Sequence, residues 1–193
     1  IPNKDHIDDL KRCMDSIEQN STYKNYEYII VENNSTDPAT FEYYKKLEAE
    51  NPKVHMVYWD GIFNYSAINN YGASFAKGEY LLLLNNDTEI INPDYSAVTA
   101  ACMMVKKSAF DAVGGLSEEL AVAFNDIDFC MKLRQAGYLI VYNPYAELYH
   151  YESKSRGLED TPEKVARFNK EIATFEKKWP DILRDGDPYY NPN

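Results

Sequence analysis

The sequence has few cysteines, few histidines and no long apolar run. The three cysteines, Cys13, Cys102 and Cys130, are odd in number and have no CxxC spacing. We therefore expect reduced, buried thiols of a cytosolic protein rather than a disulfide framework. No apolar stretch approaches the roughly 20 residues that a membrane-spanning helix needs. Any membrane association is expected to be peripheral, at the inner face of the membrane.

The sequence also lacks an excess of basic residues. The 20 Lys and Arg residues are outnumbered by 31 Asp and Glu residues, which gives a formal net charge of -11. Because nucleic acid needs a basic surface, this balance excludes it as the main partner. Acidic proteins still bind nucleotides through a metal ion and backbone N–H groups. With 45% hydrophobic residues, the 193 residues suffice for one domain with a real core.

Predicted strands and helices alternate along the chain. Apolar runs predict strands at 28–31, 54–59, 79–84 and 138–142, and the third of these is expected to be central, parallel and buried on both faces. Apolar spacing and capping residues predict helices at 7–17, from 38, at 64–77, 107–113, 126–136 and from 162. This rhythm is typical of βαβ units, in which ligands bind at the carboxyl ends of the strands.

Capping and stop residues mark several helix ends. Asn125 is predicted to cap one helix, and Gly78, Gly137 and the pair Gly114-Gly115 to end others. Thr161, followed by Pro162, is a strong start for the last long helix. That helix has an apolar face, Val165, Phe168, Ile172, Phe175 and Trp179. We expect this face to pack on the domain, with a partner surface as the alternative.

Asn85-Asn86-Asp87 follows the strongest strand and lies at the expected ligand-binding edge. Carboxylate and phosphate oxygens are the ligands that Mg²⁺ and Mn²⁺ prefer, so Asp87 is a candidate metal ligand. A strand-end turn explains the same residues equally well, because Asn and Asp favour turns.

Two further segments carry candidate residues. In Asn125-Asp126-Ile127-Asp128, a carboxylate could act as a general base, although an acidic first helical turn is favoured on its own. His150 precedes Lys154 and Arg156 in a Ser- and Gly-containing stretch, where a metal ligand and cations for a diphosphate are conceivable. Taken alone this last pattern is weak, because most single histidines are structural.

In their order, these segments resemble the family 2 glycosyltransferases with the A-type nucleotide-diphospho-sugar fold, above all bacterial members that build O-antigen, rhamnan and other surface polysaccharides. The resemblance spans nearly the whole chain. It is carried by seven loose motifs, at residues 1–5, 31–37, 70–80, 83–87, 113–116, 125–138 and 150–157. It implies an α/β fold, a Rossmann-like three-layer α/β/α sandwich with a mainly parallel, mixed central sheet.

The resemblance also implies roles for individual residues. Asp87 occupies the metal position of the family's DxD motif and His150 completes the site, so Mn²⁺ or Mg²⁺ is the implied cofactor. Asp126 matches the catalytic base of the ED motif. This implies an inverting transfer from a UDP- or dTDP-sugar to the hydroxyl of a glycan or lipid-linked acceptor. The residues implied to bind the nucleotide or sugar are Pro2, Asn3, Glu32, Asn33, Asn64, Asn70, Asn86, Lys154 and Arg156.

The chain departs from the family pattern in three places. Asn85 and Asn125 replace carboxylates of the two motifs, so the metal site is expected to depend heavily on His150. After Tyr95 the family places a long acceptor-side segment. Either this protein has lost that segment or, as we favour, the sequence skips a loop there. We divide the single domain into 1–95, the nucleotide-sugar and metal half, and 96–193, the acceptor and base half. The sequence begins at Ile1, without an initiating Met or a signal peptide. We therefore expect it to be one domain of a longer chain that has further domains.

Two other functions stay open at this point. A catalytically silent domain of the same fold would hold a nucleotide sugar or glycan for a neighbour, which the presence of Asp126 with Asp87 and His150 disfavours. A nucleotidyltransferase shares the parallel sheet. Those enzymes carry a Gly-rich loop after the first strand, and Pro2-Asn3-Lys4-Asp5 has no glycine.

Overall fold

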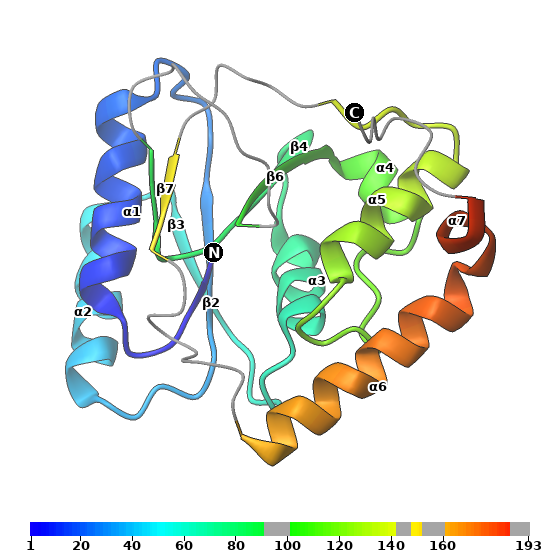
Figure 1. The fold of residues 1–193 in the computed structure, drawn as a ribbon. Helices are drawn as coiled ribbons and strands as arrows, with labels where there is room; N and C mark the ends of the chain where they lie inside the picture. Colours follow the sequence, from blue (N-terminus) through cyan, green and yellow to red (C-terminus); the bar gives the residue numbers. More distant parts are fainter. Residues whose placement is uncertain (91–100, 142–147, 152–160, 186–193) are drawn as a thin grey trace.

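The computed structural model describes residues 1–90, 101–141, 148–151 and 161–185. Its first half is a parallel sheet in the order β1-β2-β3, formed by β1 (Pro2–Asn3), β2 (Tyr28–Glu32) and β3 (Val54–Tyr58). The connections are α1 (Ile7–Asn20) and α2 (Pro38–Glu50), and α3 (Tyr65–Phe75) follows β3. Helices α1 and α2 lie on one side of these strands and α3 on the other (Figure 1). The mixed α/β architecture predicted from the sequence is confirmed.

Strand β2 shows why the layers form. Its alternate residues point to opposite faces of the sheet. Tyr28 and Ile30 pack in one core cluster with α1 and α2, whereas Val31 packs with Ile68 of α3 in another. A Cβ on Gly72 would lie 2.7 Å from the Val31 side chain, so glycine lets α3 approach the strand closely. Both faces of β2 are therefore covered.

Strand β4 (Tyr80–Leu84) differs from the prediction of a parallel strand buried on both faces. It pairs antiparallel with β6 (Cys102–Lys106). Leu81, Leu83 and Leu84 are buried, whereas Tyr80 is 56% and Leu82 39% exposed. An antiparallel pair can have one face in the core and the other in water, and the run of four leucines conceals this alternation.

A third strand pair joins distant parts of the sequence. Strand β5 (Thr88–Ile90) pairs antiparallel with β7 (Leu148–His150), with Thr88 opposite His150. The ladder continues beyond β7, because the backbone N–H of Tyr151 donates to the Asp87 carbonyl over 3.0 Å. This pairing places the end of the Asn-Asn-Asp segment beside the histidine.

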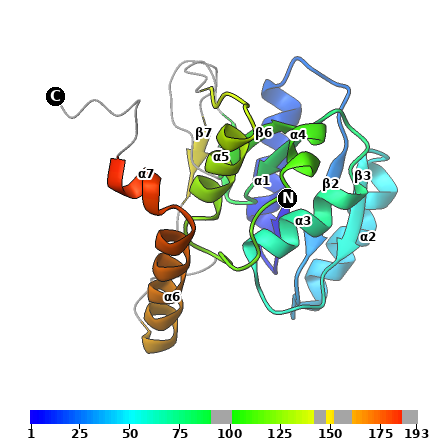
Figure 2. The same cartoon turned by 90° about the vertical axis from the view of Figure 1, so that its right-hand side faces the viewer.

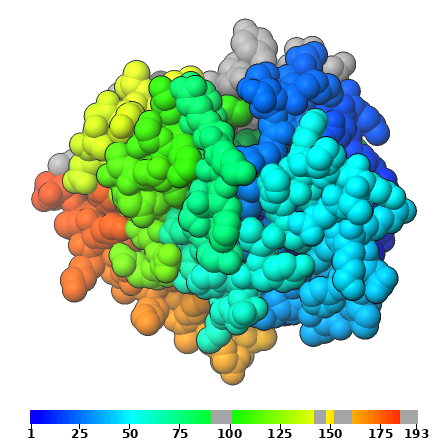
Figure 3. Space-filling view, turned by 180° about the vertical axis from the view of Figure 1, so that it is seen from behind, coloured from blue at the N-terminus to red at the C-terminus, as the bar shows by residue number. Residues whose placement is uncertain are grey.

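The second half is mainly helical, with α4 (Lys107–Ala112), α5 (Asn125–Gln135), α6 (Pro162–Lys178) and α7 (Pro180–Asp185). Helices α6 and α7 run along the edge of the molecule, next to α5 (Figures 1 and 2). In the view from behind, α3 lies between the N-terminal half, coloured blue to cyan, and the second half, coloured green to orange (Figure 3). No helix among the described residues is long and apolar enough to cross a membrane.

Local signals located some helix ends correctly and others wrongly. The side chains of Asp37 and Thr161 cap α2 and α6 as N-cap acceptors, and Gly137 has the left-handed φ of 87° expected of a helix stop. Gly78 does not stop α3, which ends at Phe75 with an extended C-cap residue.

Two further predictions in the second half are wrong. Asn125 is the first residue of α5 rather than its cap, because its side chain donates to the carbonyl of Val122. The segment Tyr138–Val141 forms no strand, and Leu139 and Val141 are 82% and 77% exposed. Without a pairing partner among the described residues, an apolar run alone does not make a strand.

Candidate active site

Asp87 and His150 meet at the start of the β5–β7 ladder. The Nε2 atom of His150 lies 3.3 Å from Oδ1 of Asp87, and it lies equally far from the side-chain amide of Asn85. Asp87 is only 7% exposed. Its Oδ1 is a buried atom that accepts no hydrogen bond from any described residue. The two residues proposed as metal ligands from the resemblance are thus brought together, although 62 residues separate them in the sequence.

The electrostatics of this pair suit a cation. Burial raises the pKa of Asp87, and the neighbouring His150 opposes that rise only in part. A buried carboxylate oxygen without a hydrogen bond is costly, and a bound cation would remove this cost. No group of three or more candidate metal ligands occurs in the described part of the chain. Two protein ligands fit a divalent ion that takes its other ligands from phosphate oxygens and water.

Glu32 lies at the carboxyl end of β2 and is fully engaged by the protein. Its carboxylate, 3% exposed, accepts hydrogen bonds from the backbone N–H and hydroxyl of Ser35 and from the hydroxyl of Tyr44. Tyr44 in turn accepts a bond of 2.7 Å from the side-chain amide of Asn3. The Asn3 carbonyl oxygen accepts a bond of 2.6 Å from the Asn86 amide. This chain of contacts ties the ends of β1 and β2 to the turn that carries Asp87.

The neighbouring Asn33 holds the loop that follows β3. Its amide donates to the carbonyls of Trp59 and Gly61, each over 3.1 Å. Asn33 is 4% exposed, and Pro2 pairs with Val31 in the sheet. The residues that the resemblance assigns to base and ribose therefore lie together at the carboxyl ends of β1 and β2, the predicted ligand-binding edge. The side-chain contacts described for them are made to the protein itself and hold this edge in place.

Asp5 and Tyr44 belong to this edge and were missed by the sequence reasoning. Asp5 adopts a left-handed φ of 57°, and its carboxylate accepts the backbone N–H groups of Thr36 and Asp37. Although desolvation opposes them, these bonds hold the pKa of Asp5 below its ordinary value. Asp tolerates a positive φ better than most residues, so an Asp just after the first strand was the sequence signal for this conformation.

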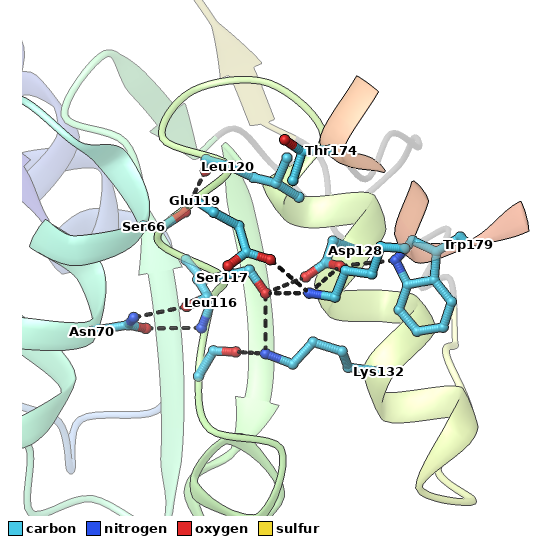
Figure 4. Close-up of polar contacts among 12 residues, drawn as sticks. Ser66, Asn70, Leu116, Ser117, Glu119, Leu120, Asp128, Lys132, Thr174 and Trp179 are labelled. Atoms are coloured by element: carbon cyan, nitrogen blue, oxygen red, sulfur yellow. Dashed lines mark hydrogen bonds and ion pairs between the residues drawn. The ribbon is translucent and has the colours of Figure 1, made fainter. Parts of the chain in front are cut away.

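Asp126 and Asp128 occupy the same helical turn but have different surroundings. Asp126 is partly exposed, and its Oδ1 accepts the backbone N–H of Ile127 over 2.8 Å. Asp128 is fully buried and contacts Ser117, Lys178 and Trp179 at distances between 2.6 and 2.8 Å (Figure 4). Although burial opposes them, these partners hold the pKa of Asp128 below its ordinary value. Asp128 is therefore structural, which leaves Asp126 as the carboxylate available for chemistry.

Tyr65, at the start of α3, is influenced by the charges of both Asp126 and Asp87. It is the first residue of α3, and its backbone N–H donates to Ala121 over 2.8 Å. Burial raises the pKa of its hydroxyl, and the charges of Asp126 and Asp87 raise it further. Nothing in the sequence distinguishes Tyr65 from the other members of its 17 tyrosines.

Two of the predicted sugar-binding residues hold the loop before α5. Asn64 caps α3 by accepting the backbone N–H of Ala67, and its amide donates to the carbonyl of Glu118. Asn70 forms a two-way bridge with the backbone of Leu116, 2.8 Å in each direction (Figure 4). Lys154 and Arg156, predicted to face the diphosphate, lie outside the described residues.

Comparison with known proteins gives a consistent picture. A family model described as glycosyl transferase family 2 matches residues 1–112. An uncharacterized protein of Sinorhizobium fredii is 37% identical over 258 residues, and the O-antigen biosynthesis protein RfbC of Myxococcus xanthus is 27% identical over the same length. Both alignments cover 100% of this chain, which spans only 28% and 20% of these relatives.

A shorter match involves an N-acetylglucosaminyl-diphospho-decaprenol L-rhamnosyltransferase of Mycobacterium tuberculosis. It is 38% identical over 60 residues, which are 31% of this chain and 20% of that protein.

Solved structures show the same fold. The mannosyltransferase PcManGT of Pyrobaculum calidifontis, in complex with GDP-Man and Mn²⁺, superposes with a TM-score of 0.69 at 14% identity, over 96% of this chain and 63% of that one. GalNAc-T7 with UDP, GalNAc and Mn²⁺ gives a TM-score of 0.68 at 12% identity, over 96% and 52%. At such identities the likeness establishes the fold, which is that of the A-type glycosyltransferases.

Proposed function

This chain belongs to glycosyl transferase family 2, and from that premise we propose that it is the catalytic domain of an inverting, metal-dependent transferase. It moves a sugar from a nucleotide diphosphate donor to a hydroxyl group of a glycan or lipid-linked acceptor in bacterial surface polysaccharide synthesis. The observation that carries the proposal is the buried Oδ1 of Asp87, which accepts no hydrogen bond from a described residue and lies 3.3 Å from Nε2 of His150.

Asp87 and His150 are the residues that would hold the metal. Mn²⁺ or Mg²⁺, when bound, would neutralise the diphosphate and so make it a better leaving group. The His150 imidazole would bind the metal through the lone pair of Nε2. The Asn3–Asn86 hydrogen bond keeps the turn before Asp87 in place, so the carboxylate needs little rearrangement to bind.

Asp126 is the proposed general base. It accepts the proton of the acceptor hydroxyl while the acceptor oxygen forms its bond to C1 of the sugar. The bond between C1 and the diphosphate oxygen breaks, and the electron pair leaves with the nucleotide diphosphate. This in-line displacement inverts the configuration at C1. A base on a helical turn that is anchored by Asp128 has the fixed geometry that such a proton transfer needs.

The donor is proposed to be a UDP- or dTDP-sugar. Solved structures of the same fold contain GDP-Man, UDP or UDP-GlcNAc, which supports a nucleotide sugar as the ligand class. The nucleotide would lie at the edge formed by Pro2, Asn3, Glu32 and Asn33. Lys154 and Arg156 are proposed to neutralise the diphosphate. The cytoplasmic location stays a prediction.

The proposal is tested by donor hydrolysis, in which water replaces the acceptor. The chain is incubated with a panel of UDP-, dTDP- and GDP-sugars, with and without Mn²⁺, and the released nucleotide is measured. We expect hydrolysis only with the metal, and a loss of roughly 10²–10⁴-fold in Asp126→Asn, the scale of general base catalysis. Asp111→Asn, an exposed aspartate on α4, is the matched control and should keep full activity.

Two outcomes would contradict the proposal. Full turnover in Asp126→Asn would show that the base is another residue. Nucleotide binding without turnover of any donor, indifferent to Mn²⁺ and to His150→Ala, would instead indicate a binding domain of the same fold.

A further inference from the structure

Phe124, two residues before the proposed base, has an unusual backbone conformation. Its φ is 63° and its ψ is 2°, in the left-handed region, and it is the N-cap residue of α5. For a large residue that is neither Gly nor Asn, this conformation is costly. It determines the direction in which the chain enters α5 and hence where Asp126 projects. Something in the structure must therefore hold Phe124 in place.

Helix α6 contacts the Phe124 ring from two positions on one face, two turns apart. The ring stacks on Phe168 at a centroid distance of 5.7 Å and on Phe175 at 5.2 Å, with interplanar angles of 29° and 25°. Residues seven apart lie on the same side of a helix, two turns from each other. The aromatic ring is thus held between two turns of α6, although Phe168 itself is 39% exposed.

Glu171 lies on the helical turn between these two phenylalanines. It is 2% exposed, and its two carboxylate oxygens accept the successive backbone N–H groups of Val122 and Ala123, over 3.1 and 2.9 Å. A buried carboxylate is costly unless it is fully hydrogen-bonded, so an apolar residue would serve better if α6 only covered the core. The carboxylate instead fixes the backbone immediately before the left-handed residue.

The C-terminal end of α6 holds the other side of the base. The ammonium group of Lys178 and the indole N–H of Trp179 each lie 2.8 Å from Oδ1 of Asp128 (Figure 4). Asp128 follows Asp126 by two residues. Helix α6 therefore contacts the chain on both sides of the proposed base, at 122–124 before it and at 128 after it.

We propose that α6 is the element that positions Asp126, and that Glu171 is its principal positioning residue. The inference rests on the proposed function of Asp126 as base, and Glu171 acts on it only through the backbone of 122–124. Proton transfer depends steeply on geometry, and a displacement of about 1 Å can cost roughly 10²-fold in rate. Helix α6 thus positions the base in addition to packing on the core through Phe175 and Trp179.

The first experiment needs no ligand. Hydrogen–deuterium exchange is measured by mass spectrometry on the whole chain, comparing Glu171→Gln with Glu176→Gln, an exposed glutamate on the same helix. Glutamine retains one acceptor oxygen only. We expect exchange in the peptide containing 121–128 to accelerate at least about tenfold in Glu171→Gln and to stay unchanged in Glu176→Gln. Unchanged exchange in both variants would overturn the proposal.

The second experiment separates positioning from stability. In Glu171→Gln, kcat for hydrolysis of the donor found active in the panel should fall at least about tenfold. Its KM and the Kd of UDP with Mn²⁺ should stay unchanged. If KM and Kd rise while kcat is retained, α6 does not position the base. If Asp126→Asn keeps full turnover, the assignment of the base is wrong, while the exchange experiment still tests whether α6 holds this segment.

A pair of variants at position 124 provides a test if Glu171→Gln does not fold. Phe124→Gly and Phe124→Ala both remove the aromatic stack, but only glycine adopts the left-handed conformation without strain. We expect Phe124→Gly to keep several-fold more turnover than Phe124→Ala. Equal or lower turnover in Phe124→Gly would overturn the proposal, because the backbone conformation would then be irrelevant to the base.

Discussion

Two buried carboxylates at the carboxyl ends of strands have opposite surroundings. Glu32, the last residue of β2, accepts three hydrogen bonds from Ser35 and Tyr44. Asp87, after β4, has a buried oxygen that accepts none from the described residues and lies 3.3 Å from Nε2 of His150. The first carboxylate completes a protein network, whereas the second is suited to a cation. Burial alone therefore does not distinguish the two carboxylates, but the hydrogen bonds that each accepts do.

The largest expected effect concerns catalysis. Asp87→Ala should reduce Mn²⁺-dependent donor hydrolysis by on the order of 10³-fold, since it removes the main carboxylate that holds the charge stabilising the leaving group. Initial rates of nucleotide release measure this. Asp111→Ala is the control and should match the unaltered chain. A loss of less than tenfold would mean that Asp87 is not a principal metal ligand. The difference between the surroundings of Asp87 and Glu32 would then have no bearing on function.

The second expected effect concerns stability. Glu32→Gln puts an amide N–H₂ group opposite a donor, so at least one buried donor loses its acceptor. A cost of roughly 1–3 kcal/mol per unsatisfied group predicts a loss of about 3 kcal/mol in the free energy of unfolding. Urea titration measures it, with the exposed Glu50→Gln as the control. A change below about 0.5 kcal/mol would show that the network does not stabilise the fold.

The third effect is smaller and has the opposite sign. Without metal, Asp87→Asn should raise the free energy of unfolding by roughly 1 kcal/mol, because the neutral amide is cheaper to bury than a carboxylate with an unpaired oxygen. The same urea titration, with a chelator present, measures it. Destabilisation by Asp87→Asn would mean that the carboxylate contributes to the fold in the way Glu32 does.

The sequence predicted well what depends on neighbouring residues. Pro38 and Thr161 marked helix starts, and Gly137 marked a stop, because capping acts within one turn. The prediction failed at β4, where an antiparallel partner 22 residues on exposes Leu82. It also failed at Asn125, whose side chain donates to Val122 instead of capping α5. These outcomes depend on tertiary partners that a local pattern does not contain.

For the site, the resemblance named residues that local patterns left ambiguous. It paired Asp87 with His150, and the β5–β7 ladder brings them to 3.3 Å. It did not separate Asp126 from Asp128, because Asp128 is structural through Ser117, Lys178 and Trp179, the last two some 50 residues away. Glu171 could not be found at all. On an exposed helix a glutamate is ordinary, and only the fold shows that its carboxylate meets two backbone N–H groups.

The smallest expected effect is a pH dependence that opposes Asp87 to Asp128. Burial raises the pKa of Asp87, so the folded chain binds that proton more tightly than the unfolded chain does. Without metal, its contribution to the free energy of unfolding is largest below the ordinary carboxyl pKa of about 3.9 and is lost as pH rises through the raised value. The pKa of Asp128 is lowered, despite its burial, by Lys178, Ser117 and Trp179. Its contribution is present above about pH 3.9 and is lost as pH falls through the lowered value.

Urea titrations from about pH 2.5 to 6 in the presence of a chelator test both slopes. Asp87→Asn should remove the decline in the free energy of unfolding above about pH 4 and keep its decline at low pH. Asp128→Asn should keep the first decline and remove the second. If both variants change the same limb, the two carboxylates share one kind of environment. The sign of each slope of unfolding free energy against pH depends only on which state of the chain, folded or unfolded, holds the proton more tightly. The contrast between a carboxylate that completes the fold and one that is suited to a cation would then fail.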